Sequence, residues 1–134
     1  MCKASFKNIR VSAVYVGNEA APFNPDNYHN HRVRVYNADN GKRTSFTFWA
    51  SIASPELRSR YEVLNALYCF VSDAVSGLDS FEDFCRNFGY DLDSRSAYQT
   101  WQACQRSSVK ALRVLGVSRS ELYDFLNALS EIAA

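Results

Sequence analysis

The chain has 134 residues and carries 15 Lys or Arg against 14 Asp or Glu, so its formal net charge at pH 7 is +1. Hydrophobic residues make up 47% of it, which is enough to build the core of a single domain over residues 1–134. The sequence has no low-complexity tract, no signal-peptide core and no apolar run long enough to span a bilayer. These features exclude a disordered or membrane-spanning chain, and we expect a soluble intracellular protein.

The near-neutral total hides an asymmetry between the two parts of the chain. Residues 1–53 carry seven Lys or Arg against three Asp or Glu, a net charge of +4, and residues 54–134 carry eight against eleven, a net charge of −3. A basic first part suits nucleic acid or an acidic protein surface. The four cysteines contain no C-x-x-C pair, so we expect free thiols and no disulfide framework.

The first part of the chain predicts strands. Residues 6–16 alternate apolar and polar side chains and predict one strand, and residues 17–30, with two prolines and four asparagines, predict a loop. Residues 32–50 predict a hairpin, because Asp39-Asn40-Gly41 can adopt the positive φ angles of a tight turn. One face of this hairpin is apolar, and the other is basic, hydroxylated and aromatic.

The second part predicts four helices, each beginning at a capping residue and the first three followed by a glycine. The predicted helices run from Ser54 to about Ser76, from Ser80 to Phe88, over about 94–115, and from the capping box Ser118–Glu121 to the end of the chain.

Strands followed by helices predict an α+β fold: a small antiparallel sheet of three strands packed against a C-terminal bundle of about four helices. Residues 1–53 would form the sheet and residues 54–134 the helices. We also expect Phe88 and Tyr90 to pack in the joint between the second and third helices, where Gly89 ends a helix.

Motifs for metal binding are incomplete. Asp91 and Asp93 have the spacing that opens a calcium loop, but the following positions lack the required glycine and ligands. We therefore expect Asp93 or Ser94 to cap the third helix and Asp91 to favour its dipole. His29 and His31 have a spacing that zinc ligands use, but no second ligand pair accompanies them. We expect no metal and no cofactor.

Motifs for catalysis are also missing. The two histidines lie in one predicted loop, and Cys85 and Cys104 lie on apolar helix faces, where burial raises a thiol pKa and lowers reactivity. No phosphate-binding loop or hydrolase motif occurs. We therefore expect a protein that is not an enzyme and has no catalytic residue.

The polar face of the hairpin is the candidate binding surface. Cations and aromatics on one side of a sheet suit stacking on bases and neutralising phosphates, and they equally suit an acidic protein surface. An ordinary solvated sheet face is the competing interpretation. The candidate residues are Arg32, Arg34, Tyr36, Lys42, Arg43, Thr47 and Trp49, with His29 and His31 in the adjoining loop.

Three segments carry a resemblance. Residues 80–105 read SFEDFCRNFGYDLDSRSAYQTWQACQ, residues 67–74 read LYCFVSDA, and residues 44–49 read TSFTFW. Together they resemble a family of small phage and prophage proteins whose pattern includes SFExFCxxFGYDxDSRxA. Residues 1–30 and 117–134 match nothing in that pattern.

The resemblance implies a phage protein in the cytoplasm of a bacterial host. Small phage proteins without catalytic motifs often act by binding, and anti-CRISPR proteins are a prominent example. Our first hypothesis is therefore an inhibitor that binds a host CRISPR–Cas or other defence protein stoichiometrically. The alternative is an accessory protein that binds single-stranded nucleic acid, which predicts salt-sensitive affinity and weaker binding when Tyr36 or Trp49 becomes Ala.

Two further features stay open at this point. A basic stripe on the third predicted helix, Arg106, Lys110 and Arg113, is expected to be a solvated surface. An exposed strand edge or the apolar last helix would allow a homodimer, so the sequence predicts either a monomer or a homodimer.

Overall fold

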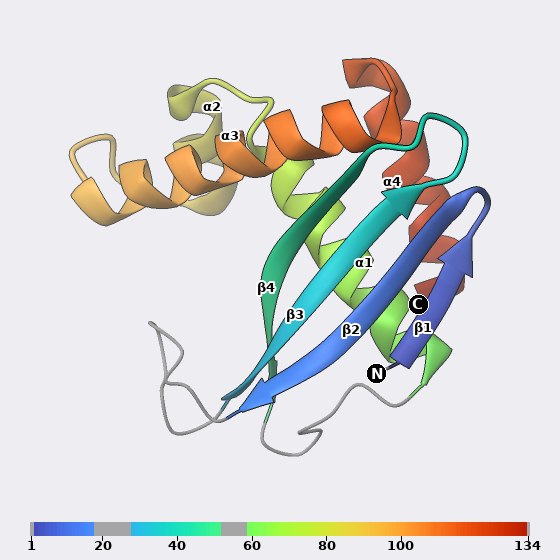
Figure 1. The fold of residues 1–134 in the computed structure, drawn as a ribbon. Helices are drawn as coiled ribbons and strands as arrows, with labels where there is room; N and C mark the ends of the chain where they lie inside the picture. The colour runs from blue at the N-terminus through green and yellow to red at the C-terminus, as the bar shows by residue number, and fades with distance from the viewer. Residues whose placement is uncertain (1, 18–27, 52–58, 134) are drawn as a thin grey trace.

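The computed structural model describes residues 2–17, 28–51 and 59–133 (Figure 1). It shows an α+β fold in which an N-terminal antiparallel sheet packs against C-terminal helices, as the sequence predicts. The elements are β1 (Cys2–Phe6), β2 (Ile9–Gly17), β3 (Tyr28–Asn37), β4 (Arg43–Ser51), α1 (Arg60–Ser76), α2 (Phe81–Phe88), α3 (Arg95–Leu115) and α4 (Arg119–Ala133).

The sheet is a meander in which each strand pairs with the next, in the order β1-β2-β3-β4. Helices α1 and α4 lie behind it in Figure 1, and α3 runs across the end where β3 turns into β4. The face toward the viewer carries exposed side chains on every strand, and we call it the open face. In the part of the chain that the structure describes, no helix has the length and apolar character needed to cross a membrane.

The sheet has four strands rather than the three predicted, because the residues before the strand expected over 6–16 form a further strand, β1. Lys7 and Asn8 form a turn between β1 and β2, which places Phe6 opposite Ile9. Lys7 adopts φ 54°, a conformation that favours glycine or asparagine over lysine. The turn therefore lacked its usual sequence signal.

Side-chain alternation builds the core. Ile9, Val11, Val33 and Val35 point from β2 and β3 toward the helices and are at most 2% exposed. Helix α1 packs at the centre of the core, with seven buried residues. The sheet and helices also meet through aromatic pairs. Phe46 stacks on Phe70 with ring centroids 4.5 Å apart, and Phe6 meets Phe125 edge-on with ring centroids 5.3 Å apart.

Helix α1 begins later than predicted. Ser59 is extended and its hydroxyl accepts a hydrogen bond from the Glu62 amide, so the N-cap is Ser59 and the first helical residue is Arg60. The expected start at Ser54 lies outside the described residues. Because Ser59 also has cap chemistry, composition alone did not distinguish the two starts.

The other helix boundaries confirm the capping predictions. Ser80 and Ser94 cap α2 and α3, and Gly89 and Gly116 end them with φ of 72° and 65°. Ser118 and Glu121 form a capping box before α4, in which the Ser118 amide donates to the Glu121 carboxylate at 3.1 Å.

The expectation that Phe88 and Tyr90 are packed is wrong. Phe84 is 2% exposed, whereas Phe88 is 55% and Tyr90 is 45% exposed. Helix α2 has eight residues and buries only Phe84 and Cys85. A helix this short has room for one buried stripe, so the next aromatics along the chain lie at the surface.

Polar side chains fasten the turn end of the sheet to α3. Asn37 is 2% exposed, and its amide nitrogen donates to the carbonyls of Val114 and Leu115 at 3.0 and 3.3 Å. Its amide oxygen accepts from Asn8 at 2.8 Å, which ties the first hairpin turn to the second. The C-terminal carbonyls of α3, which have no partner within the helix, are satisfied by the sheet.

Candidate binding face

Strand register aligns the polar side chains of the open face in rows. One row crosses all four strands through the pairs Ser5–Arg10, Arg10–Tyr36 and Tyr36–Arg43. Neighbouring strands lie about 4.8 Å apart, so the members of a row are within reach of one another. The register therefore places one arginine on each side of a central tyrosine.

The Arg10–Tyr36–Arg43 group is held by cation–π contacts. The Arg10 and Arg43 guanidinium carbons lie 6.0 and 5.6 Å from the Tyr36 ring centroid. Such contacts orient the guanidiniums without neutralising them. The row consequently presents two positive charges in fixed positions, each with free N–H donors for an anionic group.

A second row lies beside the first and alternates cations with hydroxyls. It runs through the pairs Lys3–Ser12, Ser12–Arg34 and Arg34–Ser45. Lys3 and Arg34 are exposed, and the two serines are half-buried between them. Hydroxyl and guanidinium donors at this spacing suit the oxygens of phosphates or carboxylates.

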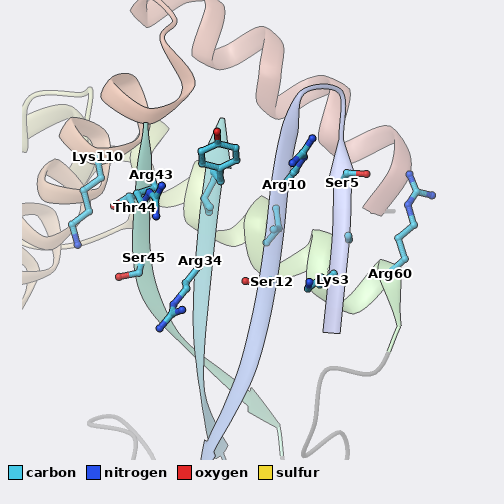
Figure 2. A pocket seen from close by; sticks show the side chains of 14 residues that line it. Lys3, Ser5, Arg10, Ser12, Arg34, Arg43, Thr44, Ser45, Arg60 and Lys110 are labelled. Carbon is cyan, nitrogen blue, oxygen red and sulfur yellow. The ribbon is translucent and has the colours of Figure 1, made fainter. Parts of the chain in front are cut away.

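The two rows line a broad open hollow of about 1250 Å³. Two further cations at its rim come from helices rather than from the sheet. Figure 2 shows Arg60 of α1 beyond β1 and Lys110 of α3 beyond β4. No carboxylate lines this hollow among the residues that the structure describes. Its cations are Lys3, Arg10, Arg34, Arg43, Arg60 and Lys110.

The stripe on α3 adjoins the open face, which the sequence did not predict. Lys110 lines the hollow, and the Arg113 guanidinium donates to the backbone carbonyl of Arg43 at 2.9 Å. The two segments are separated by 70 residues in the chain. The stripe is exposed, as expected, and through Lys110 and Arg113 the basic surface continues from β4 onto α3.

The structure groups part of the predicted set. Arg32, Arg34, Tyr36 and Arg43 lie on the open face, as the alternation predicts. Lys42 is exposed in the turn before β4, at the end of this face. The side chains of His29 and Trp49 lie outside the described residues.

The placement of His31 at a loop surface is wrong. His31 belongs to β3 rather than to a loop, and it pairs with Tyr15 of β2 and Phe48 of β4. It is 1% exposed, on the core side, in phase with Val33 and Val35. Because side chains alternate along a strand, extending β3 back to Tyr28 determined which face His31 takes.

The predicted set lacked four of the six cations that line the hollow. Lys3, Arg10 and Ser12 were not assigned to the face, because the sequence predicts no strand before residue 6 and the candidate face came from the hairpin over 32–50 alone. The alternation of Arg10 and Ser12 with buried Ile9 and Val11 was a usable signal. Arg60 and Lys110 carry no local signal, since only packing brings their helices beside the sheet.

The Cys69 and Cys104 thiols have raised pKa values. Burial, followed by the charge of Asp73, raises the pKa of the Cys104 thiol to about 11, and the same two causes raise that of Cys69. Thiols with raised pKa values are poor nucleophiles at neutral pH. Across 2–17, 28–51 and 59–133, no group of His, Cys, Asp or Glu has the arrangement of a metal site.

Comparison of the chain with protein-family models, with curated proteins and with solved structures finds no match. The geometry and charge of the open face are therefore the observations that bear on function.

Proposed function

We propose that this chain is a non-catalytic binding protein whose open face holds single-stranded nucleic acid. The observation that carries the proposal is the hollow across four strands, lined by six cations and no described carboxylate. A phosphate backbone presents one negative charge per nucleotide, and binding releases the counterions that neutralise it. Rows of Arg and Lys separated by hydroxyls match that chemistry along an extended strand.

The aromatic content of the face supports the same partner. Tyr36 lies in the middle of the hollow between two guanidinium planes, and both tyrosine rings and arginine planes stack on bases. Stacking is tolerant of sequence, so we expect little base preference. The resemblance to phage proteins supports an accessory role during infection, in the cytoplasm of a bacterial host.

A binding titration tests this proposal. Fluorescence anisotropy with a labelled oligothymidylate of about 16 nucleotides should show an affinity that falls steeply with salt. The double charge reversal Arg10→Glu/Arg34→Glu should weaken binding at least tenfold, a loss of about 1.4 kcal/mol, because two phosphate contacts become repulsions. Arg34→Ala should lower the slope of log affinity against log salt by about one.

The matched control is Arg119→Glu, which reverses an exposed arginine on α4 away from the hollow. It should leave affinity within about twofold, because unpaired surface charges distant from a ligand are screened. A protein that binds no oligonucleotide even at low salt, while its thermal unfolding is normal, would refute nucleic-acid binding.

A second candidate is the inhibitor of a host defence complex, such as CRISPR–Cas, acting by stoichiometric protein binding. The observation favouring it is that Arg10 and Arg43 flank Tyr36 in one row of the open face. Arg and Tyr are common anchors at protein interfaces, and carboxylates of an acidic partner would pair with these arginines.

Infection assays separate the two candidates. If the protein inhibits CRISPR–Cas, expressing it should restore phage growth on a CRISPR-immune host, and Arg10→Glu/Arg34→Glu should abolish that rescue. Rescue by a protein that binds no oligonucleotide would favour the inhibitor. Oligonucleotide binding with no rescue would favour the nucleic-acid role.

A further inference from the structure

A second exposed surface lies at the turn between α2 and α3, which we call the aromatic turn (residues 88–93). The Phe88 and Tyr90 rings lie 6.3 Å apart, and both rest on buried Phe84, at 4.9 and 5.8 Å. Leu92, in the same turn, is 58% exposed. Three large apolar side chains at neighbouring surface positions are typical of an interaction site.

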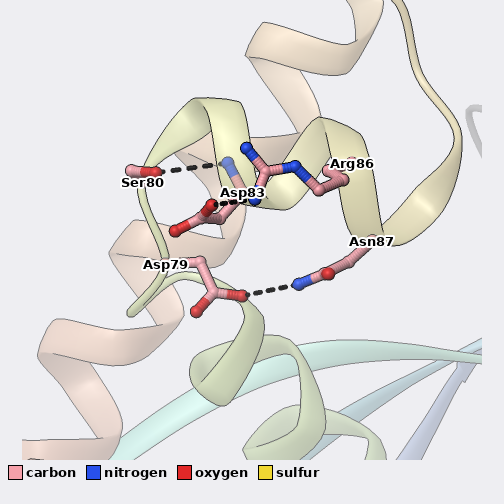
Figure 3. A network of polar contacts seen from close by, with 5 residues as sticks. All are labelled: Asp79, Ser80, Asp83, Arg86 and Asn87. Carbon is pink, nitrogen blue, oxygen red and sulfur yellow. Dashed lines mark hydrogen bonds and ion pairs between the residues drawn. The ribbon is translucent and has the colours of Figure 1, made fainter.

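The aromatic turn is held in one conformation. Gly89 takes φ 72°, the Tyr90 amide donates to the Cys85 carbonyl at 2.9 Å, and Ser94 caps the helix that follows. Figure 3 shows the base of this region, where Asn87 bonds Asp79 at 3.3 Å. Because the turn is already ordered, docking it would cost little further conformational entropy.

The aromatic turn and its surroundings are acidic. Residues 79–93 contain five Asp or Glu and one Arg, and that Arg86 pairs with Asp83 at 3.1 Å (Figure 3). Asp91 and Asp93 are exposed beside the rings. This surface therefore combines aromatic rings with carboxylates, the two groups that guanidiniums bind best.

We propose that the aromatic turn of one copy docks into the open face of a second copy. The charges are complementary, since the hollow has six cations and no described carboxylate. Arg34 and Arg10 would pair with Asp91 and Asp93 while their guanidinium planes meet Phe88 and Tyr90.

The contact must form between two copies, because the aromatic turn does not reach its own open face. Asp93 immediately precedes the cap of α3, whereas Lys110, at the rim of the hollow, lies 15 residues beyond Arg95 along that helix. At 1.5 Å per residue the separation is about 22 Å along a rigid helix. Figure 1 shows α2 and the first turns of α3 reaching beyond the edge of the sheet.

Such a contact joins two different surfaces, so in a pair of copies one keeps its hollow unsatisfied and the other keeps its aromatic turn. Head-to-tail association of this kind continues into open oligomers or closes into rings. The apolar side chains of the last helix do not offer a dimer interface, because Leu122, Phe125 and Leu129 are buried in the core of their own chain.

Sedimentation velocity over a range of protein concentrations tests the proposal. At low salt the weight-average mass should rise with concentration beyond that of a dimer, and about 1 M salt should abolish the rise, since the Debye length there is about 3 Å. Asp91→Lys/Asp93→Lys and Arg10→Glu/Arg34→Glu should each be monomeric. Both change exposed side chains, and thermal unfolding would verify that each variant folds.

Mixing the two variants gives the decisive result. The first retains its hollow and the second retains its aromatic turn, and the reversed charges on the other two surfaces are complementary as well. The mixture should therefore associate although each variant alone is monomeric. Phe88→Ser should weaken association about tenfold. The control Asp124→Lys/Glu131→Lys, which reverses two exposed acids on α4, should associate like the unaltered protein.

A protein that stays monomeric at low salt, or a mixture in which the two variants do not combine, would overturn the proposal. A symmetric dimer unaffected by either variant would do the same. The result is independent of the nucleic-acid proposal, because Asp91→Lys/Asp93→Lys should still bind oligonucleotide. If both proposals hold, oligonucleotide should dissolve the oligomers by occupying the hollow.

Discussion

The open face and the aromatic turn are two exposed surfaces of opposite charge that are built in different ways. The open face gathers side chains from β1 to β4 and from two helices, so its parts are up to 107 positions apart, from Lys3 to Lys110. The aromatic turn is made within residues 80–94 by two caps and a glycine. One surface depends on strand register, and the other depends on local backbone signals.

This difference determines which structural changes would disrupt each surface. A slip of one residue in β3 would exchange Arg34 with buried Val35 and destroy the open face, because side chains alternate along a strand. The aromatic turn would survive that slip, since its hydrogen bonds lie within the α2–α3 segment. Substitutions can therefore separate the two surfaces or weaken both.

The largest expected effect is at Gly77, where the two regions join. An added Cβ would collide with the Cys104 carbonyl and the Ser108 hydroxyl of α3, and that hydroxyl also bonds the Ala74 carbonyl. Gly77→Ala should cost about 2–3 kcal/mol of unfolding free energy, measured by urea denaturation, because backbone atoms must move apart. Both surfaces should be weakened together.

Gly41→Ala is the matched control for that substitution. Gly41 has φ 72°, and nothing lies within 4 Å of its added Cβ, so only backbone strain remains, about 1 kcal/mol. Equal losses at the two positions would contradict the close approach of α1 and α3.

The next effect should be at Asn37 and confined to the sheet. Asn37→Ala removes the buried bonds to the Val114 and Leu115 carbonyls and the oxygen that accepts from Asn8, and it should cost about 2 kcal/mol. Amide hydrogen exchange should quicken at the strand turns and stay unchanged at Tyr90. Asn87→Ala, at an exposed hydrogen bond, should cost less than about 0.5 kcal/mol.

The smallest effect should be at Ser94 and confined to the aromatic turn. Ser94→Ala removes the hydroxyl that accepts from the Ala97 amide and should cost about 1 kcal/mol. Exchange should quicken at the start of α3 while oligonucleotide affinity is unchanged. Ser96→Ala, two residues further into the helix, should have little effect on the free energy of unfolding. A loss of stability equal to that of Ser94→Ala would argue against capping by Ser94.

Much of the helical half could be predicted because its signals are short-range. The ends of α2 and α3 are each indicated by a few neighbouring residues. The structure confirms the predicted boundary residues Ser80, Gly89, Ser94 and Gly116. The start of α1 was wrong because two serines offer the same cap chemistry. The exposure of Phe88 was missed, because burial depends on the length of α2 rather than on the type of residue.

The open face could be predicted only in part. Alternation in the second hairpin placed Arg32, Arg34, Tyr36 and Arg43 on one side correctly. The predicted surface position of His31 was wrong, because the face that its side chain takes depends on where β3 begins. Arg10 was missed because the Lys7–Asn8 turn has no glycine, and the binding roles of these residues stay predictions.

By itself the sequence determined the fold class, the caps and the sides of the second hairpin, because these follow from backbone preferences and side-chain periods of two and 3.6 residues. The tertiary structure decided which charges share a surface. Strand register set Arg10 and Arg43 around Tyr36, and helix packing placed Lys110 beside them. Those neighbours come from pairing between distant segments, and no local pattern of residues specifies which segments pair.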